Sequence, residues 1–214
     1  MVKGLTLSVI ASSVVMAGGY KIPEQSLNSM ALSAAYVAHT SGADTNYFNP
    51  ANMAFMDADR SYVEGGVTLA HLPSNVYSLG PASGETEVED LPIPFFHYIA
   101  PAIGDFRWGM SMVVPGGLTK RWENQPQQSF AEEFTLKVVE LNPNVSYKIT
   151  DNFSIGGGLR LIYSEGVVKS TGDVSRDMEG DTFEFGYNLA MSYKPTSDIN
   201  FAMTYRSNIN LNEE

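Results

Sequence analysis

The chain has 214 residues, enough for one sizeable domain, and its 24 acidic against 13 basic side chains give a net charge of −11. This acidic balance argues against nucleic acid as a partner. The absence of cysteine excludes thiol catalysis and cysteine-ligated metal sites, and it suits an exported protein that does not rely on disulfides. The three histidines lack metal-ligand spacing, and no nucleophile elbow or phosphate loop occurs. We therefore expect no enzyme, no metal and no cofactor.

The first 19 residues are typical of an export signal. Lys3 precedes an apolar run over residues 5–16, and small residues follow at positions 17–19. The run is shorter than the roughly 20 residues that a spanning helix needs. Residues 1–19 are therefore predicted to be a removed signal peptide, with a buried N-terminal helix as the alternative.

The next segment, residues 20–56, lacks sustained alternation of polar and apolar side chains. It is rich in Ala, Ser, Asn and Gly and contains a helix-compatible stretch at residues 29–36. A segment of this kind does not suit a barrel wall, but larger barrels accommodate a plug in the lumen. We predict a small, mainly helical plug over residues 20–56.

Residues 57–214 carry the pattern of membrane-spanning strands. From Phe183 to Tyr193 every odd position is large and apolar or aromatic, whereas every even position is small or polar. Because successive side chains of a strand point to opposite faces, one face is apolar over about the nine to eleven residues that a spanning strand needs. Similar alternation predicts strands at residues 61–72, 93–102, 106–114, 138–148, 153–164 and 200–206.

The connections between these strands alternate in length. Tight polar turns are expected at residues 102–105, 149–152 and 195–198, and long polar links at residues 73–92, 119–137 and 166–181. Short turns at one end and long loops at the other are typical of outer-membrane barrels. A general diffusion porin shares this pattern but has no plug. A soluble β adhesin and a lipid-modifying barrel enzyme are the remaining alternatives.

Two motifs near the start of the chain resemble a known family. They are Gly19-Tyr20-Lys21-Ile22-Pro23-Glu24-Gln25-Ser26 and Asn46-Tyr47-Phe48-Asn49-Pro50-Ala51-Asn52-Met53-Ala54. Their order resembles the start of the FadL/TodX-type outer-membrane transporters of hydrophobic compounds. Further along, Trp108-Gly109-Met110-Ser111 followed by Pro115-Gly116-Gly117-Leu118 is similar to the third strand of that family, and Thr204-Tyr205-Arg206-Ser207 to a later strand.

The resemblance implies an all-β fold, an antiparallel transmembrane β-barrel of fourteen strands with an N-terminal plug. About seven strands are present here, so residues 57–214 are expected to form the first, incomplete half of the barrel, and the chain to be a fragment or a truncated reading frame. The implied function is passive uptake of long-chain fatty acids or hydrocarbons in the bacterial outer membrane, with release sideways into its lipid. The full-length protein is expected to be a monomer.

The resemblance also suggests three groups of site residues. Substrate contacts are assigned to Tyr20, Ile22 and Arg160, a kink that opens the wall to Pro115, Gly116 and Gly117, and the junction of plug and barrel to Asn49, Pro50 and Ala51. The alternatives are purely structural roles: Tyr20 is a core aromatic, a loop begins at Pro115, and the Asn-Pro pair is a turn.

Charged residues at inward positions form a further set. The alternation places Glu140, Arg160, Glu184, Asn188 and Arg206 inside the barrel. A structural network of ion pairs is the favoured interpretation, and contact between a basic residue and a ligand carboxylate is the alternative. Glu165 and Lys169 stand where fatty-acid carriers of the family are richer in basic residues. A neutral hydrocarbon or aromatic substrate therefore stays open.

Overall fold

The computed structural model describes residues 22–78, 83–172 and 175–210. The predicted signal peptide and Tyr20 lie outside these ranges. The N-terminal segment, residues 22–56, holds two short α-helices and a 3-10 helix, which are α2 (Leu27–Ala31), α3 (Thr45–Phe48) and η1 (Pro50–Phe55). The strands are β1 (Tyr62–Leu72), β2 (Val76–Tyr77), β3 (Gly84–Glu85), β4 (Glu89–Ile99), β5 (Phe106–Arg121), β6 (Glu133–Thr150), β7 (Phe153–Ser170), β8 (Arg176–Tyr193) and β9 (Phe201–Arg206).

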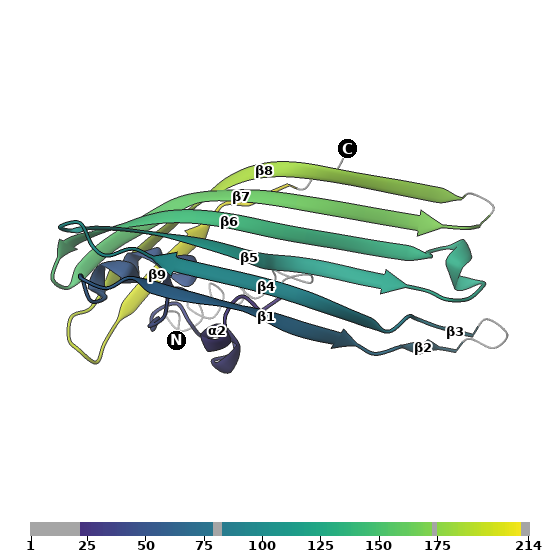
Figure 1. Cartoon of the computed structure of the whole chain (residues 1–214), viewed down its shortest axis with the longest axis horizontal. Helices are drawn as coiled ribbons and strands as arrows, with labels where there is room; N and C mark the ends of the chain where they lie inside the picture. The colour runs from purple at the N-terminus through teal and green to yellow at the C-terminus, as the bar shows by residue number, and fades with distance from the viewer. Residues whose placement is uncertain (1–21, 79–82, 173–174, 211–214) are drawn as a thin grey trace, which may run out of the picture.

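Seven of these strands form one antiparallel sheet in the order β1-β4-β5-β6-β7-β8-β9 (Figure 1). Neighbours in this sheet are also neighbours in the chain, apart from the small β2–β3 hairpin inserted between β1 and β4. Short turns join the strands at one end, and the longer connections lie at the other (Figure 1). The all-β half-barrel expected from the sequence is confirmed. The connections after β1 and β5 are long, as expected, whereas the one between β7 and β8 spans only residues 171–175 and is shorter than the turn at residues 194–200.

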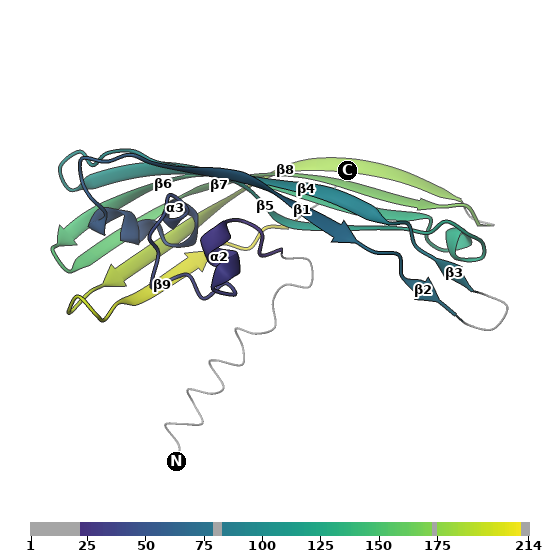
Figure 2. The ribbon, with the colours of Figure 1, turned by 60° about the horizontal axis from the view of Figure 1, so that its bottom comes forward.

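The sheet is curved, and the N-terminal segment lies against its concave side (Figure 2). Local sequence explains the short helices. Ser26 caps α2, because its Oγ accepts a hydrogen bond from the Ser29 amide at 3.0 Å. Asn49 caps η1 through the Ala51 amide at 3.2 Å, and Pro50 occupies the first helical position, where no amide hydrogen is needed.

The two faces of the sheet differ as the alternation predicts. On β8, the side chains of Phe183, Phe185, Tyr187, Leu189, Met191 and Tyr193 are exposed on the convex face. The intervening positions Asn188, Ala190 and Ser192 are buried on the concave face. The polar face of the strand is thus covered by protein, and the apolar face is not.

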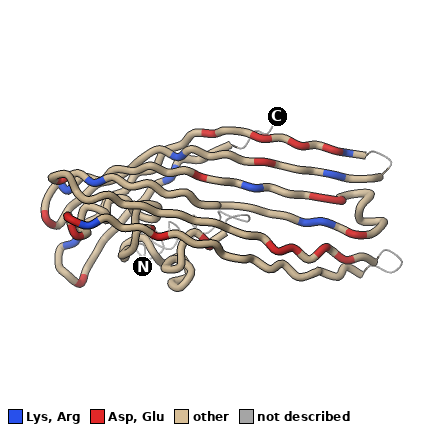
Figure 3. Tube along the Cα trace, in the orientation of Figure 1, with Lys and Arg blue, Asp and Glu red and all other residues tan. Residues whose placement is uncertain are grey.

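Four strands are longer than the sequence predicts, since β5 has 16 residues and β6, β7 and β8 each have 18. Much of the predicted links at residues 119–137 and 166–181 is therefore strand. The sequence prediction made these strands too short, because the alternating apolar side chains of the convex face stop at Val139, Tyr163 and Phe183. These three residues are cross-strand partners. The next convex-face set is Lys137, Glu165 and Asp181. Asp and Glu recur along this half of the strands (Figure 3).

Candidate functional site

The pairing between β4 and β5 is interrupted. Only four residues of β4 pair with β5, from Ile99 opposite Gly109 to Phe96 opposite Met112. The strands meet again near the long loops, where the Glu87 amide donates to the Arg121 carbonyl at 3.0 Å. Between these points, residues 88–95 and 113–120 face each other without ladder pairs, and we call this stretch the β4–β5 break.

Two prolines account for the point at which pairing stops. The Ala100 amide donates to the Trp108 carbonyl of β5 at 3.0 Å. Because backbone donors of a strand alternate between its two neighbours, the even-numbered residues of β4 direct their amides toward β5. Pro94 and Pro92 occupy two of these even positions and have no amide hydrogen to donate. The ladder between β1 and β4, which uses the other positions, is continuous.

On the opposite side of the break, β5 is distorted. Its register with β6 shifts by one residue between Val113 and Gly116, which is a β-bulge. Pro115 lies within this bulge, and its carbonyl accepts a hydrogen bond from the Ile22 amide at 3.3 Å. Of the three residues assigned to the kink, Pro115 lies in the bulge, whereas Gly116 and Gly117 pair with Val138 and Lys137 of β6. The structure brings Ile22 of the N-terminal segment to this bulge.

Behind the break, on the concave side, lies a small apolar cluster. Phe95 of β4 and Val113 of β5 are buried together with Tyr47 of α3, and Phe48 packs against them. The rings of Tyr47 and Phe48 make an edge-to-face contact with 5.2 Å between centroids. The inner end of the break therefore has an apolar lining contributed by two strands and by the N-terminal segment, whereas at its outer end the Thr119 hydroxyl donates across it to the Glu89 carboxylate at 3.2 Å.

Tyr47 is held in this cluster from the other side by charged residues. The Arg206 guanidinium lies 3.9 Å from the centroid of the Tyr47 ring and donates to the Tyr47 carbonyl at 2.6 Å. Burial raises the pKa of the Tyr47 phenol to about 12, and the nearby Arg206 charge opposes part of that rise. Tyr47 is thus a neutral, fixed aromatic side chain at physiological pH.

Arg206 belongs to a buried charge triad. The fully buried carboxylate of Glu140 lies 2.8 Å from Arg206 and 2.8 Å from Arg160. Arg160 also donates to the Ser207 carbonyl at 2.8 Å. The predicted network of inward ion pairs is present in this form, with two cations sharing one anion.

Three asparagines spaced by three residues attach the N-terminal segment to the wall. Asn46 donates to the Ser111 hydroxyl at 2.7 Å, and Asn49 donates to the Ser192 hydroxyl at 2.9 Å. Asn52 contacts Asn200 across a distance of 3.4 Å. Side chains of β5, β8 and the β8–β9 turn therefore all contact α3, η1 or the residue between them.

Glycines of the wall allow this contact to be close. A Cβ atom on Gly156 of β7 would lie 2.6 Å from the Ala51 amide nitrogen and 2.7 Å from the Pro50 carbonyl carbon. The Ser154 hydroxyl, on the same face, donates to the Ala51 carbonyl at 2.8 Å. The predicted junction residues Asn49, Pro50 and Ala51 thus lie on the wall itself.

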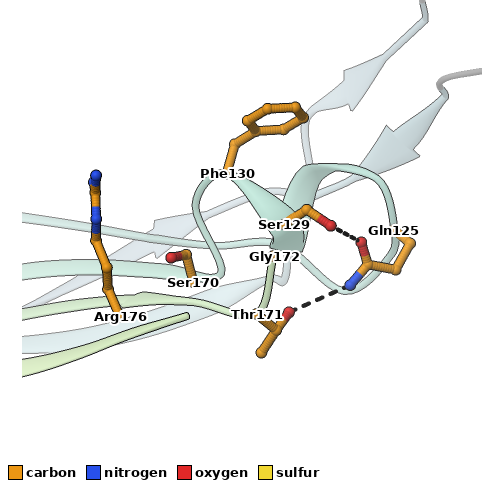
Figure 4. Close-up of a pocket in the computed structure, with 7 residues that line it drawn as sticks. All are labelled: Gln125, Ser129, Phe130, Ser170, Thr171, Gly172 and Arg176. Atoms are coloured by element: carbon orange, nitrogen blue, oxygen red, sulfur yellow. Dashed lines mark hydrogen bonds between the residues drawn. The ribbon is translucent and has the colours of Figure 1, made fainter. Parts of the chain in front are cut away.

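A separate cavity of about 610 Å³ lies at the end with the long connections (Figure 4). Two connections line it, the one between β5 and β6 and the one between β7 and β8. The lining residues are Gln125, Ser129, Phe130, Ser170, Thr171, Gly172 and Arg176. Phe130 is 82% exposed, and Arg176 lines the same cavity. The rim of the cavity therefore carries both an apolar ring and a positive charge.

The sequence profile of the family described as "Outer membrane protein transport protein (OMPP1/FadL/TodX)" matches residues 8–214. The chain belongs to this family. A long-chain fatty acid transport protein of Salmonella typhi is 21% identical over 94% of this chain and 53% of its own length. Outer membrane protein P1 of Haemophilus influenzae is 25% identical over 48% of this chain and 22% of its own length. The chain therefore spans about half the length of the Salmonella relative.

Two solved structures share the fold of this FadL/TodX-family chain. A FadL homologue of Pseudomonas aeruginosa has a TM-score of 0.66 at 20% identity and covers 89% of this chain and 53% of its own. The toluene transporter TbuX of Ralstonia pickettii has a TM-score of 0.60 at 14% identity and covers 82% of this chain and 56% of its own. The antiparallel barrel fold predicted from the sequence is confirmed.

Membership of the FadL/TodX family places the chain in the bacterial outer membrane. The convex face carries an apolar band, which ends beyond Val139, Tyr163 and Phe183, where charged side chains replace the apolar ones. None of the described helices is long and apolar enough to cross a membrane. On β1 and β4 the exposed pair His71 and Asp90 follows Leu69 and Pro92 on the convex face, so Pro92 and Pro94 lie at the outer end of the apolar band.

Other predicted residues take different places. Glu165 and Lys169 face outward beyond the apolar band, where Glu165 pairs with Lys137 at 3.4 Å and Lys169 with Glu179 at 3.0 Å. Sequence reasoning did not assign Pro92, Pro94 or the buried His97 to the site. The two prolines could have been assigned from the sequence, because prolines two residues apart remove backbone donors from the same side of a strand.

The charge triad gives a stability prediction. Replacing Glu140 by Gln leaves two arginines without their shared carboxylate, so the unfolding free energy should fall by about 3–5 kcal/mol. The midpoint of heat-dependent unfolding on gels measures the change. Glu165→Gln is the matched control, since its exposed pair should contribute less than about 1 kcal/mol. Equal midpoints for the two variants would contradict a stabilising role for the triad.

Proposed function

We propose that this protein takes up hydrophobic compounds passively across the outer membrane, through a barrel plugged by residues 20–56, and releases them sideways into lipid through the β4–β5 break. The observation that carries the proposal is the break itself, an interruption of backbone pairing that begins at the outer end of the apolar band. Its inner side is apolar, through Tyr47, Phe95 and Val113. The relatives named for fatty acid and for toluene transport support the substrate class.

The energetics favour such a route for an apolar solute. Removing apolar surface from water gains about 25 cal/mol per Å². Transfer of a bound solute from an apolar site back to the aqueous periplasm is therefore unfavourable. The buried cluster at the break offers an apolar site next to the wall. Movement from that site into lipid exchanges one apolar environment for another, whereas exit along the axis meets the tightly hydrogen-bonded asparagines of the N-terminal segment.

The cavity between the outer connections suits the first capture of the solute. Phe130 supplies apolar surface and Arg176 a positive charge at its rim. Ile22, whose amide binds the Pro115 carbonyl, then contacts the solute inside, and Tyr20 is proposed as a second contact from the resemblance to the family. When the substrate is a fatty acid, Arg160 binds its carboxylate. Arg160 must then donate to the substrate as well as to Glu140 and the Ser207 carbonyl. A neutral hydrocarbon does not need this contact.

Uptake measurements test the lateral route. Cells expressing the complete reading frame are given a radiolabelled alkane and a radiolabelled long-chain fatty acid. Changing Gly116 and Gly117 together to Val favours regular strand structure by about 1 kcal/mol per residue, so uptake of both solutes should fall. A Cβ on Gly117 approaches no atom closer than 3.5 Å, so its replacement is sterically tolerated. Unchanged uptake in the double variant would refute the lateral route.

A further inference from the structure

His97 differs from the other two histidines of the chain. Its side chain is fully buried on the concave face of β4, whereas His39 and His71 are exposed. Its Nε2 lies 2.7 Å from the Gln25 carbonyl oxygen, and its Nδ1 lies 2.8 Å from the Ser111 hydroxyl of β5. His97 thus contacts the N-terminal segment and the neighbouring strand at once.

The hydrogen-bond partners define which nitrogen carries the proton. A carbonyl oxygen only accepts, so Nε2 must donate to Gln25, and the ring is neutral if Nδ1 accepts from Ser111. The Ser111 oxygen in turn accepts from the Asn46 amide at 2.7 Å. The bonds therefore run in one direction from Asn46 through Ser111 and His97 to Gln25.

These bonds lie at the inner end of the β4–β5 break. His97 and Ser111 are cross-strand partners, one residue from the last pair of the ladder. Residues 22–25 are bound to β5 through the Ile22 amide and the Pro115 carbonyl, and to β4 through His97. This stretch is therefore attached to both strands that border the break.

Protonation of His97 conflicts with this arrangement. A proton on Nδ1 turns an acceptor into a donor, and the Ser111 oxygen would then face two donors, His97 and Asn46, with its own hydrogen left unplaced. Burial of the ring acts in the same direction, because an imidazolium removed from water is destabilised. The carboxylates of Glu64, its partner on β1, and of Asp44 in the N-terminal segment act in the opposite direction, since they attract a cationic ring.

The remaining titratable neighbours are neutral aromatic groups. The Tyr47 ring of α3 lies 6.3 Å from the His97 ring, and the Tyr36 hydroxyl donates to Asp44 at 3.0 Å. We propose that His97 is a proton-sensitive positioning residue, which holds residues 22–25 across the β4–β5 break while it is neutral and releases them when it is protonated. Its consequence for uptake rests on the proposed function, but the release itself does not.

Distance measurements between spin labels test the release without any transport assay. The chain has no cysteine, so Leu27→Cys in α2 and Val145→Cys on the convex face of β6 give two exposed, specific attachment sites. The complete protein is purified in detergent, and double electron–electron resonance is recorded between about pH 8 and about pH 5, where histidine titrates. We expect a second, displaced distance population that rises about tenfold as the pH falls.

Three variants make the test specific. His97→Gln keeps a donor for Gln25 but cannot titrate, so its distances should stay at the high-pH value throughout. Ser111→Ala removes the conflict at Nδ1 and should shift the transition along the pH axis. His71→Gln, far from the N-terminal segment on the convex face, should behave as the parent does. A parent distribution that ignores pH, or a His97→Gln variant that responds as the parent does, overturns the proposal.

Discussion

Gly156→Val is expected to displace the N-terminal segment from the wall. The added Cβ alone would lie 2.6 Å from the Ala51 nitrogen and 2.7 Å from the Pro50 carbonyl carbon, and both are backbone atoms that cannot rotate away. Overpacking of this kind costs about 3 kcal/mol or more at such a site. Since the segment is proposed to plug the barrel, the ion conductance of the complete protein in planar bilayers should rise, and its heat-dependent unfolding should shift to lower temperature.

Gly65→Val is the matched control for this experiment. Gly65 lies on the convex face of β1, and a Cβ there would be 3.4 Å from the Phe96 ring, which is nearly ordinary contact. The control should keep the conductance and stability of the parent. If Gly156→Val also keeps both, the N-terminal segment is not seated on β7 as described.

Replacing Pro92 and Pro94 together by Thr is expected to close the β4–β5 break. Each substitution restores a backbone donor that faces β5, and each new hydrogen bond contributes about 1 kcal/mol. Uptake of a radiolabelled alkane by cells expressing the complete reading frame should fall by about tenfold or more. Protection of the amides at positions 92 and 94 against hydrogen exchange would show directly that the ladder has extended.

Pro101→Thr provides a control for the loss of a proline as such. Pro101 is exposed in the short connection between β4 and β5, away from the break. Its replacement should leave uptake unchanged. Protected amides together with full uptake in the Pro92 and Pro94 variant would mean that solutes leave by another route.

The sequence predicted the sheet well where one face is apolar and the other is polar. The strand at residues 183–193 illustrates this, because the apolar side chains at its odd positions are the ones that are exposed in the structure. The prediction was poorer beyond the apolar band. There Lys137, Glu165 and Asp181 occupy the convex face, and a strand with polar side chains on both faces has no hydrophobic period to detect.

The candidate site was predicted only in part for a related reason. The bulge at Pro115 follows from local backbone chemistry, so a proline next to two glycines indicated an irregularity there, with the start of a loop as the alternative. Pro92 fell at the end of a predicted loop, because proline argues against strand when the neighbouring pairing is unknown. The bonds of His97 join residues that are 72 and 14 positions apart. Such contacts depend on the register of the folded sheet, which the alternation alone does not define.

A hydrophobic solute is expected to pass the β4–β5 break on its way into lipid. Photolabelling detects this passage, with a radiolabelled alkane that carries a diazirine and the complete protein in outer-membrane vesicles. We expect labels on the concave-face residues Phe95 and Val113, above the background found at lipid-exposed Val145. Labels on the short turns, at Ile103 and Lys194, with none above background at Phe95 and Val113, would contradict the account and indicate exit along the barrel axis.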